Sequence, residues 1–169
     1  GYFNQGLPRN SFGKSVGKLM FYMKKTLLIT GGSQGIGQAT AIMAAQKGYA
    51  VIVNFAQNTA AAEDTIAQIL EAGGDAISIQ ADISKEEDVL QMFKQIDAKY
   101  GRLDALVNNA GIVGPQTKVV DMSAERIHNI LSINVLGSFL CAREAVKRMS
   151  VSKGGKGGSI VNLSSIAAR

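Results

Sequence analysis

Short apolar runs alternate with amphipathic segments from Lys25 to the end of the chain. The apolar runs are four or five residues long and many contain β-branched residues, which is typical of strands buried on both faces of a sheet. We expect strands at residues 27–30, 51–55, 76–80, 105–108 and 160–163. The helical spacing of apolar positions between them predicts helices near residues 36–47, 60–72, 85–99 and 124–149.

Strands that alternate with helices predict right-handed β-α-β crossovers and a parallel sheet covered on both faces. We therefore expect an α/β fold with a doubly wound parallel sheet, the Rossmann fold, with five strands in this stretch. Boundary residues support the helices: Asn58 or Thr59 can cap the second, Ser84 can cap the third with Glu87 three residues on, and Gly101 can end the third.

Residues 1–22 precede this pattern and lack clear periodicity, and the chain does not begin with Met. Met23, directly before the first predicted strand, would serve as a natural start. We interpret residues 1–22 as a leader, a tag or a disordered extension, with a basic transit peptide as the alternative. Residues 23–169 are then the N-terminal part of a single Rossmann dinucleotide-binding domain.

Composition narrows the class of protein further. With 169 residues, 46% of them hydrophobic and 18% charged, the chain can form one core. No run of eighteen apolar residues predicts a membrane span, and with no secretion signal we expect a cytoplasmic protein. The net charge is +5, but three of these charges lie in residues 1–22, and no aromatic residues interleave a basic stripe. We therefore expect no nucleic-acid partner and no membrane partner.

A glycine-rich segment follows the first predicted strand directly. It reads Thr30-Gly31-Gly32-Ser33-Gln34-Gly35-Ile36-Gly37. Gly31 permits the tight turn off the strand, Gly35 lets a phosphate approach bare backbone, and Gly37 lets the next helix pack close to the sheet. A pyrophosphate would then rest on N–H groups at the helix N-terminus. The candidate cofactor contacts in this turn are Gly31, Ser33, Gln34, Gly35, Ile36 and Gly37.

The end of the second predicted strand bears on the choice of cofactor. Asn54 and Phe55 stand there as candidate contacts, with no Asp or Glu to bind the two ribose hydroxyls of NAD. The missing carboxylate removes repulsion toward a 2′-phosphate, although no Arg or Lys stands there either. We therefore expect NADP as the cofactor, with NAD as the alternative.

The third and fourth predicted strands end in further candidate cofactor contacts. Asp82 either caps the next helix or accepts a hydrogen bond from an adenine amino group, with Ile83 beside the ring. Asn108 and Asn109 can cross-link carbonyls of neighbouring strands, while Ala110 and Gly111 leave room for a ribose and nicotinamide. A simple Asn-rich turn is the alternative explanation of this second segment.

In this order and at these intervals, the motifs resemble those of the classical short-chain dehydrogenase/reductase family. The matching residues are Thr30-Gly31-x-x-x-Gly35-x-Gly37, Asp82, Asn108-Asn109-Ala110-Gly111, Asn134 within Ser132-Ile133-Asn134-Val135, and Ser159-Ile160-Val161-Asn162-Leu163-Ser164-Ser165. The chain is most similar to bacterial sugar-dehydrogenase-like or oxoacyl-reductase-like members. The resemblance implies hydride transfer between a nicotinamide cofactor and a small carbonyl or secondary alcohol, and a homo-oligomer, dimer or tetramer, when full length.

The resemblance also implies two catalytic roles. Ser165 would hydrogen-bond the substrate oxygen, and Asn134 would hold a water in a proton relay. Both are chemically reasonable, because a hydroxyl can stabilise charge on a carbonyl oxygen and a helical amide needs a polar partner. From the residues alone, the favoured interpretation of Ser165 is a strand-end hydroxyl bonded to backbone, and that of Asn134 is a satisfied helix amide; the family resemblance favours the catalytic roles.

One feature of the family is missing from this sequence. The family's general acid is a Tyr in a Tyr-x-x-x-Lys helix, a dozen or so residues beyond the Ser, and neither residue is present. We expect an oxidoreductase whose downstream part is absent; a naturally truncated, non-catalytic nucleotide-binding or interaction module is the alternative. A chain ending at Arg169 would bind nucleotide poorly, catalyse essentially nothing and expose a sheet edge.

Three remaining segments carry no expected chemistry. His128 is the only histidine and lacks a partner at ligand spacing, so we expect no metal site. Cys141, the only cysteine, lies in an apolar helical context typical of a buried, inert thiol. Residues 152–159 have the composition of a mobile solvent loop rather than a phosphate site.

Overall fold

The computed structural model describes residues 24–165, so the interpretation of residues 1–22 concerns a segment outside the described residues. Every predicted strand and helix is present, with ends within one residue of expectation. The main elements are β1 (Thr26–Ile29), α2 (Gly35–Gln46), β2 (Ala50–Phe55), α3 (Thr59–Glu71), β3 (Asp75–Gln80), α4 (Glu86–Tyr100), β4 (Ala105–Asn108), α5 (Ala124–Leu131), α6 (Ser138–Met149) and β5 (Ser159–Asn162). Short helical turns η1 (Val119–Asp121) and η3 (Val151–Lys153) flank α5 and α6.

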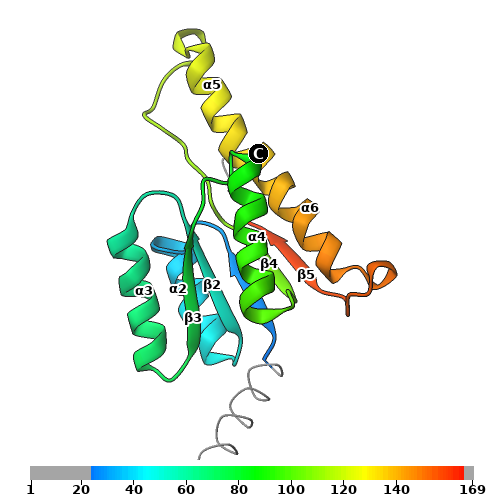
Figure 1. Ribbon diagram of the computed structural model, residues 1–169. Helices are drawn as coiled ribbons and strands as arrows, with labels where there is room; N and C mark the ends of the chain where they lie inside the picture. Colours follow the sequence, from blue (N-terminus) through cyan, green and yellow to red (C-terminus); the bar gives the residue numbers. More distant parts are fainter. Residues whose placement is uncertain (1–23, 166–169) are drawn as a thin grey trace, which may run out of the picture.

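The five strands form one parallel sheet in the order β3-β2-β1-β4-β5. Helices cover both faces: α2 and α3 pack on one, and α4 and α6 on the other (Figure 1). This order, with its reversal beside β1, is the doubly wound Rossmann arrangement. The predicted fold class is therefore confirmed.

The core follows the two-residue period of the strands. In β1, Leu27 and Ile29 belong to the cluster packed on α2 and α3, whereas Leu28 belongs to the cluster packed on α4 and α6. All three are buried, because a parallel sheet with helices on both faces has no solvated side. This double burial explains why the strands are nearly continuous apolar runs.

Two of the predicted helix boundaries are confirmed and one is wrong. The side chain of Asn58 accepts a hydrogen bond from the N–H of Ala61 at 3.0 Å, and Gly101 ends α4 in the left-handed conformation at φ 67°. Ser84 is not the cap of α4, because the N-cap position falls on Lys85. The N–H and hydroxyl of Ser84 instead donate to Asp82, two residues earlier, at 3.0 and 2.7 Å.

The long helix predicted at residues 124–149 is interrupted. Between α5 and α6 lies a π-helical segment, η2 (Ser132–Gly137), and the axis continues through it (Figure 1). π-Helical turns are rare and are frequent at functional sites. Here the segment contains Asn134, one of the two residues for which the sequence suggested a catalytic role.

Cys141 is fully buried on α6, as its apolar context predicted. Burial and the neighbouring charge of Glu144 raise the pKa of the thiol to about 12, so it stays protonated. Among residues 24–165, no helix is long and apolar enough to cross a bilayer.

Candidate functional site

The glycine-rich turn lies where the chain order of the strands reverses. β1 has β2 on one side and β4 on the other, so the two halves of the sheet diverge from its carboxyl end. In open parallel sheets, ligands bind in the crevice at this point. The turn between β1 and α2 therefore occupies the position expected of a nucleotide-binding loop.

Gly31 and Gly37 are fixed by close packing inside this turn. Gly31 has a φ of +61°, and a Cβ there would lie 2.9 Å from the Cα of Ala110. A Cβ at Gly37 would lie 2.3 Å from the carbonyl oxygen of Gly31 and 2.5 Å from Nδ2 of Asn109. Both contacts are shorter than real Cβ atoms make, so only glycine allows α2 to start this close to β1 and β4.

The N-terminus of α2 fits an anionic group. Gln34 occupies the N-cap position without a side-chain cap, and the first turn contains no acidic residue. Gly35 has a φ of +56° with open space where a Cβ would be, and Ile36 is 68% exposed. Backbone N–H groups at such a helix end attract phosphate. Ser33, by contrast, is buried, and its carbonyl oxygen accepts from the hydroxyl of Thr65 at 3.2 Å.

Thr30 and Asn109 bind the ends of β1 and β4 together. The hydroxyl of Thr30 accepts from the N–H groups of Asn109 and Ala110 at 3.0 and 3.1 Å. Nδ2 of Asn109 donates to the carbonyl oxygens of Thr30 and Gly31, both at 2.9 Å. The cross-linking expected of this amide is thus present. Thr30 is a positioning residue: the sequence motif included it before Gly31, but sequence reasoning assigned it no role.

Asn54 binds the backbone around the turn from the β2 side. Its Nδ2 donates to the carbonyl oxygen of Ala81 at 3.0 Å, and its Oδ1 accepts from the N–H of Gly31 at 3.4 Å. Asn54 and Phe55 are 2% and 6% exposed. Asn54 therefore acts on the turn through the backbone, and the exposed positions after β2 begin at Ala56.

A cavity of about 390 Å³ lies beside the carboxyl ends of β2 and β3. Ala56 and Gln57 line it together with Lys85, whose ammonium group lies 3.6 Å from Oδ2 of Asp82. Lys85 is a cation that sequence reasoning missed, because it lies 28 positions after Gln57 and only the fold brings the two to one cavity.

Asp82 has a structural role at this edge. Burial raises the pKa of its carboxyl group, but hydrogen bonds from Ser84 and the charge of Lys85 outweigh burial, so the pKa is lowered. Its Oδ1 accepts from Ser84, and its backbone N–H donates to Asp88 at 2.9 Å. Ile83 is 4% exposed and packs against Gly137 of η2, where an added Cβ would lie 2.7 Å from the Ile83 side chain.

A second cavity, of about 480 Å³, brings together the residues at the ends of β4 and β5. Its walls come from the segment after β4, from η2 and α6, and from the segment after β5. They are Asn108, Asn109, Ala110, Gly111, Asn134, Val135, Ser138, Phe139, Ala142, Asn162, Leu163, Ser164 and Ser165. Both candidate catalytic residues thus face the same cavity as the three candidate contacts after β4. None of these lining side chains is ionisable at neutral pH.

The side-chain amide of Asn134 forms hydrogen bonds with the backbone of the neighbouring loop. Its Oδ1 accepts from the N–H of Ile112 and its Nδ2 donates to the carbonyl oxygen of Ile112, both at 2.8 Å. The hydroxyl of Ser138 donates to the carbonyl oxygen of Asn134 at 3.2 Å. This two-point contact ties η2 to the segment after Gly111.

Asn108 is a further polar residue at this cavity that sequence reasoning treated only as a strand cross-link. It is 4% exposed, and its Nδ2 donates to Oδ1 of Asn162 at 2.9 Å and to the carbonyl oxygen of Ser138 at 3.2 Å. Its Oδ1 has no partner among the described residues. The pair Asn108–Asn162 joins β4 to β5.

Tyr100 is remote from this cavity. It ends α4 near the amino end of the sheet, where its hydroxyl donates to Asp75 at 3.4 Å. Burial and the charge of Asp75 raise the pKa of Tyr100. Among residues 24–165, no group of three or more His, Cys, Asp or Glu side chains is arranged to hold a metal ion.

The fold and the turn together define a Rossmann-type, doubly wound domain. The chain belongs to the short-chain dehydrogenase family, whose model, described as short chain dehydrogenase, matches residues 25–169. The family resemblance inferred from the motifs is thereby confirmed.

The named relatives are considerably longer than this chain. It is 56% identical over 142 residues to the uncharacterized oxidoreductase YgfF of Escherichia coli (strain K12), covering 84% of this chain and 58% of the relative. It is 40% identical over 140 residues to a 3-oxoacyl-(acyl-carrier-protein) reductase of Synechocystis, covering 83% and 55%. The chain thus spans little more than half the length of these relatives.

Among solved structures, a metagenomic short-chain oxidoreductase in complex with NADP matches with a TM-score of 0.80 and 28% identity, over 88% of this chain and 66% of that one. A Serratia marcescens short-chain dehydrogenase/reductase mutant matches with a TM-score of 0.79 and 29% identity, over 87% and 58%. These structures share the fold described above.

Proposed function

We propose that the chain is the cofactor-binding part of an NAD(P)-dependent oxidoreductase that acts on a small carbonyl or secondary alcohol substrate. The observation that carries this proposal is the convergence of the glycine turn and the cavity containing Asn134 and Ser165 at one edge of the sheet. The nicotinamide cofactor supplies or accepts the hydride when it is bound. Gly35 and the N-terminus of α2 would bind its pyrophosphate, and the segment 109–111 its nicotinamide ribose.

Ser165 and Asn134 are the proposed catalytic residues of this chain. A hydroxyl at Ser165 would donate to the substrate oxygen as negative charge develops there. Asn134 would hold the polar relay through which a proton reaches that oxygen, since its π-helical segment borders the same cavity. In the described chain the Asn134 amide is bonded to Ile112, so its remaining capacity is one N–H and one lone pair.

The proposed reaction also needs a proton donor. The cavity around Ser165 has only neutral lining residues among those described. General acid catalysis needs a group whose pKa suits proton transfer near neutral pH. We propose that a Tyr paired with a Lys, in a part of the protein not present in this sequence, completes the site.

NADP is the proposed cofactor in preference to NAD. Lys85 lines one cavity with Ala56 and Gln57, and a cation there would attract a 2′-phosphate. The carboxylates of Asp82 and Asp88 at this cavity each accept hydrogen bonds from neighbouring backbone or hydroxyl groups, which reduces their repulsion. The solved relative whose description names NADP lends further support.

We propose that the full-length protein forms a homo-oligomer, a dimer or a tetramer. Apolar side chains on α5, η2 and α6 remain exposed, including Ile127 at 41%, Leu131 at 52% and Val146 at 50%. Exposed apolar side chains gathered on one helical segment are typical of an interaction site. Sedimentation analysis of the full-length protein tests this, and a monomer at micromolar concentration would contradict it.

The alternative is a naturally truncated module that binds nucleotide without catalysis. The two proposals predict different coding sequences after Arg169 and different catalytic turnover. An open reading frame that continues into Tyr-x-x-x-Lys excludes the truncated module. A frame that stops at Arg169, together with nucleotide binding and no turnover, would overturn the oxidoreductase proposal.

The activity test uses the full-length reading frame and a panel of carbonyl substrates, with NADPH oxidation as the readout. Ser165→Ala should lower kcat by roughly a hundredfold or more, as expected for the loss of one donor to a developing oxyanion. Ser159→Ala, at the other end of β5, is the matched control and should leave kcat unchanged. Equal activity of the two variants would remove Ser165 from the mechanism.

Cofactor preference has its own test. Lys85→Glu should weaken NADPH binding about tenfold relative to NADH, because it replaces an attractive charge by a repulsive one. The ratio of the two dissociation constants is measured by fluorescence titration. An unchanged ratio would show that Lys85 does not contact a 2′-phosphate.

A further inference from the structure

One buried hydroxyl lies next to the glycine turn and has no part in the chemistry proposed above. Thr65 stands on α3 and is fully buried. The other buried residues of α3 are Ala62 and Ile69, which share its face of the helix. A valine would fill the same space, and burial of a hydroxyl is unfavourable unless it forms hydrogen bonds. The partners of the Thr65 hydroxyl therefore indicate what it does.

The hydroxyl of Thr65 connects three segments of the chain. Its oxygen accepts a hydrogen bond from Nε2 of Gln38 on α2 at 3.1 Å. It lies within donor distance of two carbonyl oxygens, that of Ala61 one turn earlier on α3 at 2.9 Å and that of Ser33 in the glycine turn at 3.2 Å. One hydroxyl hydrogen can be shared between two such acceptors in a three-centre bond. Thr65 thus links α2 and α3 to the turn that is proposed to bind the pyrophosphate.

The bond to Ser33 restrains one peptide group of the turn. No peptide bond among the described residues is cis, so the carbonyl of Ser33 and the N–H of Gln34 point in opposite directions. Because Thr65 holds this carbonyl toward α3, the N–H of Gln34 points away from α3. This N–H has no hydrogen-bond partner within residues 24–165, and Gln34 is the N-cap residue of α2. Thr65 therefore sets the direction of an unbonded donor at the start of the helix.

The N–H of Gln34 begins a run of unbonded donors. In the described chain, the first N–H in this segment with a backbone acceptor is that of Gln38, which donates to the carbonyl oxygen of Gln34 at 3.2 Å. The N–H groups of residues 34–37 precede it, and such groups attract phosphate. Gly35, at φ +56°, has no side chain to restrict its backbone. A bond from α3 to Ser33 therefore restrains the turn beside the residue at which the backbone is freest.

We propose that Thr65 is a positioning residue for the pyrophosphate of the cofactor and acts through the Ser33–Gln34 peptide group, with Gln38 as the donor that orients its hydroxyl. This inference rests on the proposed oxidoreductase function, because it needs a dinucleotide at the glycine turn. Without the hydroxyl, a smaller fraction of the molecules presents the Gln34 N–H to the cofactor, and the apparent affinity falls with that fraction. The hydride step is unaffected, since Thr65 is buried behind the turn.

Two variants of the full-length protein separate the hydroxyl of Thr65 from its volume. Thr65→Val keeps the volume and removes the hydroxyl, whereas Thr65→Ser keeps the hydroxyl and removes a methyl group. Thr65→Val should raise the dissociation constants of NADPH and NADH by the same factor, about threefold or more, which corresponds to one net hydrogen bond. Thr65→Ser should bind both as the parent does, and kcat at saturating cofactor should be unchanged in both variants. Weaker binding by Thr65→Ser than by Thr65→Val would assign Thr65 to packing and overturn the inference.

Thr40→Val on α2 is the matched control for the loss of a helical hydroxyl. The hydroxyl of Thr40 donates to the carbonyl oxygen of Ile36, four residues earlier, at 2.7 Å. Thr65 has the same relation to Ala61. Both valine variants therefore lose a bond to the preceding turn of their own helix, and only Thr65→Val also loses the bond to Ser33. Equal weakening of cofactor binding by the two would overturn the inference.

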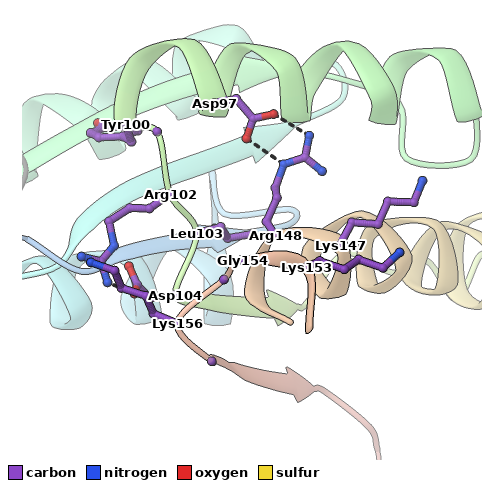
Figure 2. Close-up of a pocket in the computed structure, with 13 residues that line it drawn as sticks. Asp97, Tyr100, Arg102, Leu103, Asp104, Lys147, Arg148, Lys153, Gly154 and Lys156 are labelled. Atoms are coloured by element: carbon purple, nitrogen blue, oxygen red, sulfur yellow. Dashed lines mark hydrogen bonds and ion pairs between the residues drawn. The ribbon is translucent and has the colours of Figure 1, made fainter. Parts of the chain in front are cut away.

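A remote variant controls for a general loss of stability. At the amino ends of β4 and β5, a cavity of about 420 Å³ is lined by residues of α4, α6 and the loop 153–157, and Figure 2 shows Arg148 bound to Asp97 there. The two bonds run from Nε to Oδ1 at 2.7 Å and from Nη2 to Oδ2 at 2.6 Å. Asp97→Asn removes the charge from this pair and should lower the free energy of unfolding without changing either dissociation constant. Weakening of cofactor binding equal to that of Thr65→Val would show that stability alone explains the effect.

The role of Gln38 is tested by a double-variant cycle. Gln38→Leu removes the donor at 3.1 Å and should also weaken binding of both cofactors. Combined with Thr65→Val, it should weaken binding no further than Thr65→Val alone, because both act through one hydroxyl. Additive effects would overturn the assignment of Gln38.

The outcome separates this inference from the proposed function. A parent protein that binds neither NADPH nor NADH would overturn the proposed function, and the role of Thr65 with it. A parent that binds either cofactor, with Thr65→Val binding it equally well, would overturn the role of Thr65 alone. A larger effect of Thr65→Val on NADPH than on NADH would place its action at the 2′-phosphate and overturn the assignment to the pyrophosphate.

Discussion

Replacing Gly37 by Ala tests the close packing on which the candidate cofactor site depends. A Cβ at this position would lie 2.3 Å from the carbonyl oxygen of Gly31, 2.5 Å from Nδ2 of Asn109 and 2.9 Å from the Cα of Gly32. The Asn109 amide is itself bonded to the carbonyl oxygens of Thr30 and Gly31. The methyl group can therefore be accommodated only if α2 moves away from the ends of β1 and β4.

The expected cost combines three terms. Alanine is favoured over glycine inside a helix by about 1 kcal/mol. Overpacking of this kind costs about 1–3 kcal/mol, and loss of the Asn109 bond to Gly31 costs about 1 kcal/mol more. We expect Gly37→Ala to lower the free energy of unfolding by about 1–3 kcal/mol. Urea unfolding followed by circular dichroism measures this change.

The matched control is Gly48→Ala, just past the other end of α2. Gly48 has a φ of +86° with open space around its Cβ position, so an alanine there is strained without a clash. The left-handed conformation costs about 1–2 kcal/mol. Both variants should lose stability, but in the full-length protein only Gly37→Ala should weaken NADPH binding. A Gly37→Ala chain as stable as the parent, or binding NADPH equally well, would refute the packing argument.

Three further predictions concern single side chains. Asn109→Ala removes the donor that lies 2.9 Å from the carbonyl oxygens of Thr30 and Gly31, and should lower the free energy of unfolding by about 1–3 kcal/mol. A free energy of unfolding equal to that of the parent, measured by urea unfolding, would contradict this. Burial raises the pKa of Asp82, but the hydrogen bonds from Ser84 and the charge of Lys85 lower it by more than burial raises it. The ionised Asp82 therefore stabilises the fold above its unfolded pKa near 4, and this stabilisation is lost as the pH falls through the folded pKa. The stability difference between the parent and Asp82→Asn should therefore shrink below about pH 4, and a difference that is constant from neutral to acid pH would count against the assignment. Cys141, with its pKa raised to about 12, should react with a thiol reagent at pH 8 at least about a hundredfold more slowly than free cysteine, and rapid labelling of the native chain would contradict its burial.

The fold was predictable because each element carries its own local signal. β1 is an apolar run followed by a glycine turn, and α3 begins at an Asn cap whose side chain does accept from Ala61. Such signals depend on residues a few positions apart, so the sequence contains them directly. The helix boundary misplaced at Ser84 shows the limit: a carboxylate two residues earlier competes for the same hydroxyl.

Parts of the candidate site depend on contacts between distant segments, and these could not be predicted. Lys85 reaches the cavity after β2 only because β2 and β3 pair in register. The π-helical turn around Asn134 has no sequence signal of its own, because the apolar period of α5 and α6 continues across it. The hydrogen bonds that the N–H groups of Gly155 and Gly157 donate to the carbonyl oxygens of Ser150 and Met149 are likewise not visible in a segment whose composition is that of a flexible linker.

Titration of the ¹⁵N-labelled full-length protein with NADPH tests the central claim most directly, namely that a dinucleotide binds across the carboxyl ends of β1 and β4. The account predicts saturable shifts at Gly31, Gly35 and Gly37 and in residues 109–111, with no shift at Gly101 near the opposite end of the sheet. Shifts confined to Gly101 and residues 153–157, or no saturable shift at all, would contradict it.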